Sequence, residues 1–193
     1  MQSILAHPID AVFGLAWTAF LLYWGISAVG IGASRKNRNW AAVALMSIAA
    51  VGLFLLLQSA FIQRNSNDRL WQRSLPLSII ALAIVLTGLF VLIWARRTLG
   101  SNWNPKVETK EWQALVQTGP YARVRHPIYT GFLTMVLGSA LAYGRILGVA
   151  VLFAFVAGFC FKALREESVL TKVYGSAYQE YQAKTKAFLP YIV

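Results

Sequence analysis

Long apolar runs alternate along the chain with short connectors that are mostly basic. In the first half these runs cover residues 10–33, 40–62 and 76–99, and each ends at a cluster of polar or basic residues. About 20 apolar residues in helical conformation are needed to cross the hydrocarbon core of a bilayer. The pattern therefore predicts three transmembrane helices in the first half of the chain.

Two residues mark where the first and third of these helices should begin. Asp10 stands at the start of the first apolar run, where its side chain is expected to cap the helix. Pro76 opens the third run, and proline is tolerated in a first helical turn because the N–H groups there have no partner within the helix.

The second half of the chain begins with its longest polar segment, residues 100–127. Two further apolar runs follow, residues 128–143 and 146–164, and only Gly144 and Arg145 separate them. So short a connection predicts an antiparallel helical hairpin. Gly131 and Gly138 are expected to share one helical face and to let the two helices of the hairpin approach closely.

Beyond residue 164 the pattern becomes amphipathic with mixed charge. The last helix of the hairpin is expected to continue through residues 165–174 and to stop at Gly175, a common helix terminator. Ser176 and Gln179 have the spacing of a capping box for a second short helix, on which Tyr178 and Tyr181 share a face. This tail is expected to fold back toward the membrane.

Composition supports the assignment as an all-α integral membrane protein with about five transmembrane helices. The chain of 193 residues is 58% hydrophobic and only 13% charged, with a mean hydropathy of +0.55. That length allows one compact bundle. Residues 1–99 and residues 100–193, the predicted catalytic part, are therefore expected to form one structural unit.

The net charge of +11 is explained by membrane topology. The basic residues lie between apolar runs and do not form a patch interleaved with aromatic residues, so no nucleic acid partner is expected. Most of them fall in the connectors after the first, third and fifth runs, which predicts that the 100–127 segment and the tail face the cytosol. The protein would be multi-pass, in the inner membrane if bacterial or the endoplasmic reticulum if eukaryotic.

The candidate chemistry centres on Arg125, His126 and Tyr129, at the start of the fourth apolar run. Pro127 disfavours helical geometry at His126, so these side chains are expected to turn toward the interior of the loop. Glu166 and Glu167 lie just beyond the fifth run, although carboxylates are unfavourable at a helix C-terminus.

If the hairpin forms, both glutamates lie close to Arg125 and His126. The residues alone leave three interpretations open. The basic residues could belong to a positive cytosolic rim, the charges could form a structural salt bridge, or the cluster could hold a zwitterion. One histidine and a glutamate pair do not make a metal ligand set.

These residues also resemble a known family. The second half of the chain is similar to the isoprenylcysteine carboxyl methyltransferases and their phospholipid methyltransferase relatives. The resemblance covers residues 96–193. It rests on Leu99-Gly100, Asn102-Trp103, Pro105, Thr118-Gly119-Pro120-Tyr121, Arg125-His126-Pro127, Tyr129, Gly131, Glu166-Glu167, Tyr174-Gly175, Tyr178, Tyr181 and Leu189-Pro190.

The resemblance implies an integral membrane methyltransferase that binds S-adenosylmethionine in a pocket closed by the C-terminal tail. It implies that His126, Tyr129 and Glu167 contact the cofactor, with Glu166 and Tyr121 close by. It also implies that Arg125 orients an anionic acceptor or the cofactor carboxylate, and that Tyr178, Tyr181 and Leu189 wall the adenosine side. Arg125 and His126 are the catalytic candidates.

The acceptor stays open between a prenylcysteine-like carboxylate, a lipid amine and a small lipophilic thiol. A carboxylate needs no base, whereas a thiol or amine must lose a proton, which His126 could accept. Membrane lipids are expected around the protein, and no obligatory protein partner is evident. The alternatives are a non-catalytic membrane protein with a structural ion-pair network and, less favoured, an enzyme like the sterol reductases that uses a nicotinamide cofactor.

Overall fold

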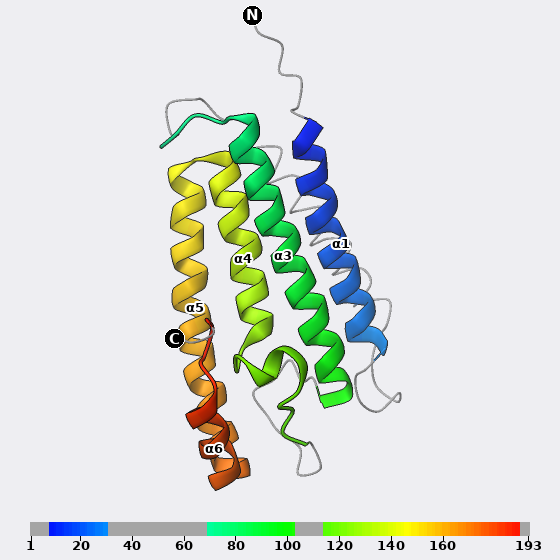
Figure 1. Ribbon diagram of the computed structural model, residues 1–193, viewed down its shortest axis with the longest axis vertical. Helices are drawn as coiled ribbons and strands as arrows, with labels where there is room; N and C mark the ends of the chain where they lie inside the picture. Colours follow the sequence, from blue (N-terminus) through cyan, green and yellow to red (C-terminus); the bar gives the residue numbers. More distant parts are fainter. Residues whose placement is uncertain (1–7, 31–68, 103–113, 190–193) are drawn as a thin grey trace, which may run out of the picture.

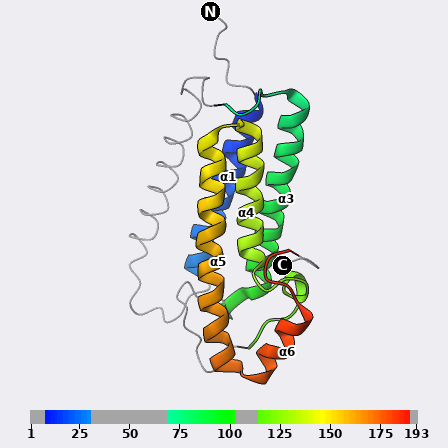
Figure 2. The same cartoon turned by 90° about the vertical axis from the view of Figure 1, so that its left-hand side faces the viewer.

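The computed structural model describes residues 8–30, 69–102 and 114–189. In these ranges the chain forms an all-helical bundle in which the four longer helices lie side by side and the last, short helix folds back at one end (Figures 1 and 2). The predicted helix over residues 40–62 lies outside the described residues. The helices are α1 (Pro8–Gly30), α3 (Leu75–Leu99), α4 (Pro127–Tyr143), α5 (Ile146–Tyr174) and α6 (Ser176–Lys184).

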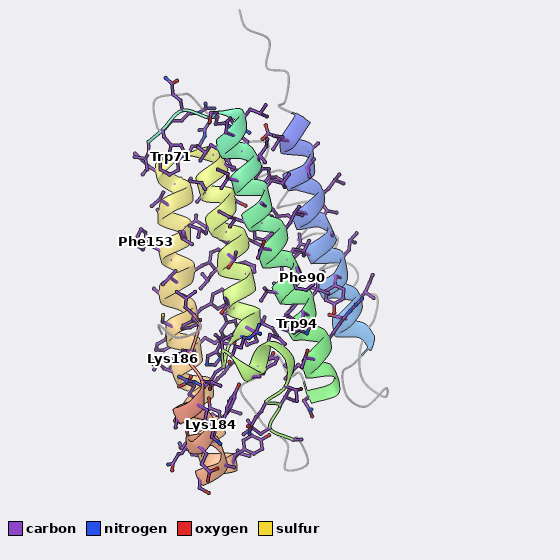
Figure 3. All side chains as sticks on the ribbon, in the orientation of Figure 1. Trp71, Phe90, Trp94, Phe153, Lys184 and Lys186 are labelled. Atoms are coloured by element: carbon purple, nitrogen blue, oxygen red, sulfur yellow. The ribbon has the colours of Figure 1, made fainter. Side chains whose placement is uncertain are left out.

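Three of the helices in the described ranges, α1, α3 and α5, are long and apolar enough to cross a membrane. α4 is shorter, with 17 residues. Large apolar side chains project outward from the bundle, among them Phe90, 64% exposed, and Phe153, 67% exposed (Figure 3). Such an apolar exterior suits contact with lipid, because in a bilayer the exposed face of a helix is apolar.

The start of α3 follows the sequence prediction closely. Ser74 caps the helix, its hydroxyl accepting a hydrogen bond from the Leu77 N–H at 3.4 Å, and Pro76 lies in the first turn. The prediction for Asp10 is wrong. α1 begins at Pro8, so Asp10 lies inside the first turn, and its buried carboxylate accepts hydrogen bonds from both terminal nitrogens of Arg73. The pair ties the start of α1 to the segment that enters α3.

The predicted hairpin of α4 and α5 is present. Gly144 ends α4 with φ 62°, and its N–H donates to the carbonyl oxygen of Ala140. Positive φ is accessible to glycine without the steric penalty of a side chain. Trp71 covers this turn, and its indole N–H donates to the carbonyl oxygen of Leu141 at 2.9 Å.

The glycine face of α4 packs against α3, and the prediction that it faces α5 is wrong. A Cβ atom on Gly131 would lie 2.7 Å from the carbonyl oxygen of Gly88, and one on Gly138 would lie 2.7 Å from that of Ala81. Gly88 and Ala81 both belong to α3. The reason is complementarity, since α3 offers a glycine opposite Gly131 and so lets the two backbones meet.

α5 continues to Tyr174 and ends at Gly175, as predicted. The capping-box prediction is wrong, because Gly175 itself, with φ 56°, is both the residue that ends α5 and the N-cap of α6. Ser176 is the first helical residue, and α6 has no side-chain cap. Tyr178 and Tyr181 share the buried face of α6, as predicted, with their rings 6.0 Å apart and edge to face.

Candidate active site

The tail that follows α6 runs beside the segment that enters α4. The N–H of Arg125 donates to the carbonyl oxygen of Lys186 at 2.8 Å, and the N–H of His126 donates to that of Ala187 at 3.0 Å. The hydroxyl of Thr130 donates to the carbonyl oxygen of Phe188 at 2.8 Å. The tail therefore folds back, as predicted, and reaches the base of α4 (Figure 2).

His126 adopts a non-helical conformation, φ −122° and ψ 56°, directly before Pro127, which is the effect expected of a following proline. Its ring is stacked on that of Tyr129, with centroids 5.4 Å apart and planes inclined by 8°. The side chain is 5% exposed. A single proline thus turns the imidazole away from the helix surface and into the interior.

Glu167 lies at the centre of a polar cluster at the open end of the hairpin. Oε1 accepts from Nε of Arg125 at 2.7 Å and lies 3.0 Å from Nε2 of His126. Oε2 accepts from the side-chain amide of Gln182 at 3.0 Å. The prediction that the hairpin brings the glutamates to Arg125 and His126 is confirmed.

Glu166 has fewer hydrogen bonds. Its Oε1 accepts a short hydrogen bond of 2.6 Å from the hydroxyl of Tyr129. Its Oε2 lies 3.7 Å from Nδ1 of His126, and its Oε1 lies 3.9 Å from Nζ of Lys162, both beyond hydrogen-bond distance. The side chain is 24% exposed, against 15% for Glu167. Because a carboxylate offers about four lone-pair sites, Glu166 retains acceptor capacity for a ligand.

An aromatic cluster continues from Tyr129 toward the middle of the bundle. The ring of Tyr129 is stacked on that of Phe159 at 4.6 Å, and Phe132 meets Phe159 at 5.5 Å and Phe155 at 5.0 Å. These residues come from α4 and α5. The polar cluster therefore adjoins apolar surface within the membrane-spanning part of the bundle.

A pocket opens beside the polar cluster, between the end of α3, residues 114–116, and the α5–α6 corner. The pocket is partly open to solvent, and its lining is mainly apolar and aromatic. Of the predicted site residues, Tyr121, Arg125, Tyr178 and Tyr181 line it. Arg125 belongs to both the pocket wall and the polar cluster.

The other predicted residues do not line this pocket. His126, Tyr129, Glu166 and Glu167 form the adjoining polar cluster. Leu189 is 48% exposed and follows Phe188, whose ring lies 5.7 Å from that of His126. Sequence reasoning missed the lining residues 114–116. Their signal is a short apolar run, Ala114-Leu115-Val116, within the longest polar segment of the chain.

The tyrosines of the pocket are held in their neutral form. Burial raises the pKa of Tyr181 to about 12, and it also raises the pKa of Tyr121 and of Tyr178. The hydroxyl of Tyr181 donates to the carbonyl oxygen of Tyr121 at 2.7 Å and so fixes α6 against η3 (Gly119–Ala122). Neutral aromatic walls suit a flat, uncharged part of a ligand.

The known proteins that the chain resembles include methyltransferases. The chain resembles the protein-S-isoprenylcysteine O-methyltransferase of Xenopus laevis, 34% identical over 119 residues, which are 60% of this chain and 41% of that protein. The corresponding enzyme of Schizosaccharomyces pombe is 30% identical over 116 residues, 58% of this chain and 49% of that protein. The chain thus spans about half the length of the curated relatives it matches, or less.

Two further likenesses extend over more of the chain. An uncharacterized protein of Bacillus subtilis, YpbQ, is 29% identical over 131 residues, 68% of this chain and 70% of that protein. The fold is that of the eukaryotic intramembrane Ras methyltransferase ICMT, with a TM-score of 0.60 and 23% identity over 98% of this chain and 70% of the other. Residues 77–177 match the phospholipid methyltransferase family. The chain belongs to this family, as its second half led us to expect.

Proposed function

We propose that the chain is an integral membrane methyltransferase that transfers a methyl group from S-adenosylmethionine to a lipophilic acceptor. The observation that carries the proposal is the junction of the polar cluster with the tyrosine-lined pocket. There, Glu166, Glu167 and Arg125 offer both anionic and cationic groups beside an aromatic pocket. Membership of the family supports the same reaction class.

The residues present fit the proposed cofactor. Its ammonium group needs an anion, and Glu166 has acceptor capacity left after its hydrogen bond with Tyr129. Its carboxylate needs a cationic donor, which Arg125 offers at the pocket wall. Its adenosine part needs a flat apolar wall, which Tyr121, Tyr178 and Tyr181 provide. Bound there, S-adenosylmethionine supplies an activated methyl group on a sulfonium.

The protein mainly has to align the reactants and exclude water. Alignment of reacting groups can contribute several kcal/mol. The tail over Arg125 and His126 closes the cluster on one side, and the stack of His126 on Tyr129 closes it on another. An acceptor carboxylate would need nothing further from these side chains, because it is already a nucleophile.

A thiol or amine acceptor would require a base, and His126 is positioned for that role. With its Nε2–H donating to Glu167, the imidazole carries its lone pair on Nδ1, which faces Glu166. A proton accepted at Nδ1 would face Glu166, and the resulting imidazolium would lie between the two carboxylates. The acceptor itself would approach along the aromatic cluster of Tyr129, Phe159, Phe132 and Phe155, which suits a lipid or lipidated molecule.

We assign the site to the cytosolic face of the membrane. In the described ranges, the end of the bundle that carries the site holds most of the basic residues, including Lys184 and Lys186, while Trp71 lies at the opposite end (Figure 3). Arg73 shortly precedes α3 and Arg145 directly precedes α5, and Arg69 pairs with Arg145, so these three arginines lie at the end with Trp71. An excess of lysine and arginine is typical of cytoplasmic connectors.

Calorimetric titration of the purified protein with S-adenosylhomocysteine and, separately, with a reduced nicotinamide dinucleotide tests the proposal. We expect the first ligand to bind and the second not to bind. His126→Ala and Glu167→Gln should weaken binding about tenfold or more, since each removes a charge-assisted contact of the cluster. Arg165→Gln is the control, because this exposed side chain on the same helix packs on Phe161 outside the cluster.

Absence of S-adenosylhomocysteine binding, or binding unaffected by both substitutions, would rule out the proposed reaction. An assay of labelled methyl transfer to lipid carboxylates, amines and thiols would then identify the acceptor class. If His126 acts as a base, His126→Ala should abolish transfer to a thiol or amine at saturating cofactor, whereas transfer to a carboxylate should persist.

A further inference from the structure

The hydroxyl of Tyr178 is buried and has no hydrogen-bond partner among the described residues. Tyr178 is 1% exposed, so its hydroxyl is shielded from bulk solvent. A buried polar group without a partner destabilises the folded state, and most such groups in proteins are satisfied. An exception inside a candidate ligand site points to a partner that arrives with the ligand.

The neighbouring tyrosines differ in this respect. Tyr181, one turn further along α6, donates to the carbonyl oxygen of Tyr121 at 2.7 Å. Tyr129 donates to Glu166 at 2.6 Å. The ring of Tyr178 is fixed edge to face against that of Tyr181, 6.0 Å away, so the unsatisfied hydroxyl belongs to a side chain held in place. The same helix therefore carries one satisfied and one unsatisfied buried hydroxyl.

Tyr178 also lines the pocket, together with Tyr121, Tyr174 and Tyr181. Arg125 lines the same pocket, and its Nε donates to Glu167, so the pocket adjoins the polar cluster. A ligand part bound among these rings would be flat and mainly apolar, with nitrogen or oxygen atoms at its edge. The nucleoside part of S-adenosylmethionine has this chemistry, whereas its amino acid part does not.

We propose that the Tyr178 hydroxyl donates a hydrogen bond to the adenosine part of the bound cofactor, to a nitrogen of the base or an oxygen of the ribose. The assignment rests on the proposed function and specifies one of its contacts. It makes Tyr178 a selectivity residue for the nucleoside, because a buried donor without a partner discriminates against ligands that lack the matching acceptor.

The assignment predicts opposite effects of one substitution on stability and on binding. Tyr178→Phe removes the unsatisfied hydroxyl and leaves the ring, so the unliganded protein should unfold at a higher temperature than the wild type. The same change should weaken binding of S-adenosylhomocysteine about tenfold, the usual effect of one lost hydrogen bond. Tyr181→Phe is the matched control, because it breaks the bond to Tyr121 and should lower the unfolding temperature.

A second ligand separates the adenosine part from the amino acid part. Methylthioadenosine keeps the nucleoside and lacks the amino acid, so Tyr178→Phe should weaken its binding by the same factor as for S-adenosylhomocysteine. A lower unfolding temperature of unliganded Tyr178→Phe, unchanged binding of both ligands, or a loss confined to S-adenosylhomocysteine would overturn the assignment. If the wild type binds neither ligand, the proposed function fails and the assignment fails with it.

Discussion

Nε of Arg125 lies 2.7 Å from Oε1 of Glu167, and this ion pair joins three parts of the chain. Glu167 belongs to α5, and Arg125 belongs to the segment that enters α4. Nη1 of Arg125 donates to the carbonyl oxygens of Gln182 in α6 and of Thr185, the first residue of the tail. One guanidinium nitrogen, Nη1, thus holds the tail, and a second, Nε, bonds α5, in addition to any contact that Arg125 makes with a ligand.

Replacement of Arg125 by glutamine should therefore release the tail. The N–H of His126 donates to the carbonyl oxygen of Ala187, so its hydrogen exchange reports directly on tail opening. We expect this amide to exchange about tenfold faster or more in Arg125→Gln, because charge-assisted hydrogen bonds to the tail are lost. Mass-spectrometric or NMR exchange of the unliganded protein measures the effect.

Arg123→Gln provides the control, since Arg123 is an exposed arginine two residues away in the same loop. Hydrogen exchange of the His126 N–H in Arg123→Gln should equal that in the wild type. Exchange at His126 that stays slow in Arg125→Gln would show that the backbone pairing alone holds the tail.

Glu166→Gln should weaken binding of S-adenosylhomocysteine by about 10- to 100-fold, because an ammonium group loses its anionic partner. The hydrogen bond from Tyr129 can be retained by the amide oxygen, so the local structure should persist. Calorimetric titration measures the change, with Glu180→Gln on the exposed face of α6 as the control. If Glu166→Gln and the wild type bind the ligand with equal affinity, the ammonium group of the ligand must contact a side chain other than Glu166.

Gly131→Ala should destabilise the protein by about 1–3 kcal/mol or more, because overpacking a tight interface forces backbone shifts. The added Cβ would lie 2.7 Å from the carbonyl oxygen of Gly88 in α3. Gly158→Ala in α5 is the control, since no atom lies within 4 Å of its added Cβ. Alanine favours helix formation over glycine, so Gly158→Ala should be neutral or stabilising. Thermal unfolding in detergent compares the two, and equal unfolding temperatures would contradict the close α3–α4 contact.

Docking of α6 should fail at alkaline pH. Burial raises the pKa of Tyr181 from 10.0 to about 12. A group whose pKa is raised on folding contributes stability that is complete below the unfolded value and is lost as pH rises toward the folded value. We therefore expect α6 to stay docked up to about pH 10 and to detach between about pH 10 and 12.

Tyrosinate absorbance, followed together with near-ultraviolet circular dichroism of the packed aromatic rings, monitors this transition. Tyr181→Phe cannot ionise at this position, so its circular dichroism should be less dependent on pH over the same interval. Identical pH profiles for Tyr181→Phe and the wild type would exclude Tyr181 as the responsible group.

The parts of the fold that sequence reasoning predicted well are those with local signals. Pro76 marks the start of α3, Gly144 marks the hairpin turn and Gly175 marks the end of α5. The contact of Gly131 with α3 was not predictable in this way. A glycine face shows that another backbone approaches closely, but the identity of that neighbour depends on where the partner helix also has a small residue.

The candidate site also has one part that local sequence signals predict and another part that depends on packing. Pro127 and the hairpin suffice to bring His126 and Glu167 together, because both effects act over short stretches of sequence. The pocket wall at residues 114–116 depends on how the loop packs against α6, which no local pattern specifies. Likewise, the sequence shows that Tyr178 and Tyr181 share a face, and only packing shows which hydroxyl finds a partner.

Gly175 has a geometric consequence for the whole site. Gly175 is both the residue that ends α5 and the N-cap of α6, so no linker separates the two helices. The orientation of the pocket wall on α6 therefore depends on α5, the helix that carries Glu166 and Glu167. A rotation of α5 about its axis in the bilayer would turn the carboxylates and the tyrosine wall together, and the distance between the two halves of the site would be preserved.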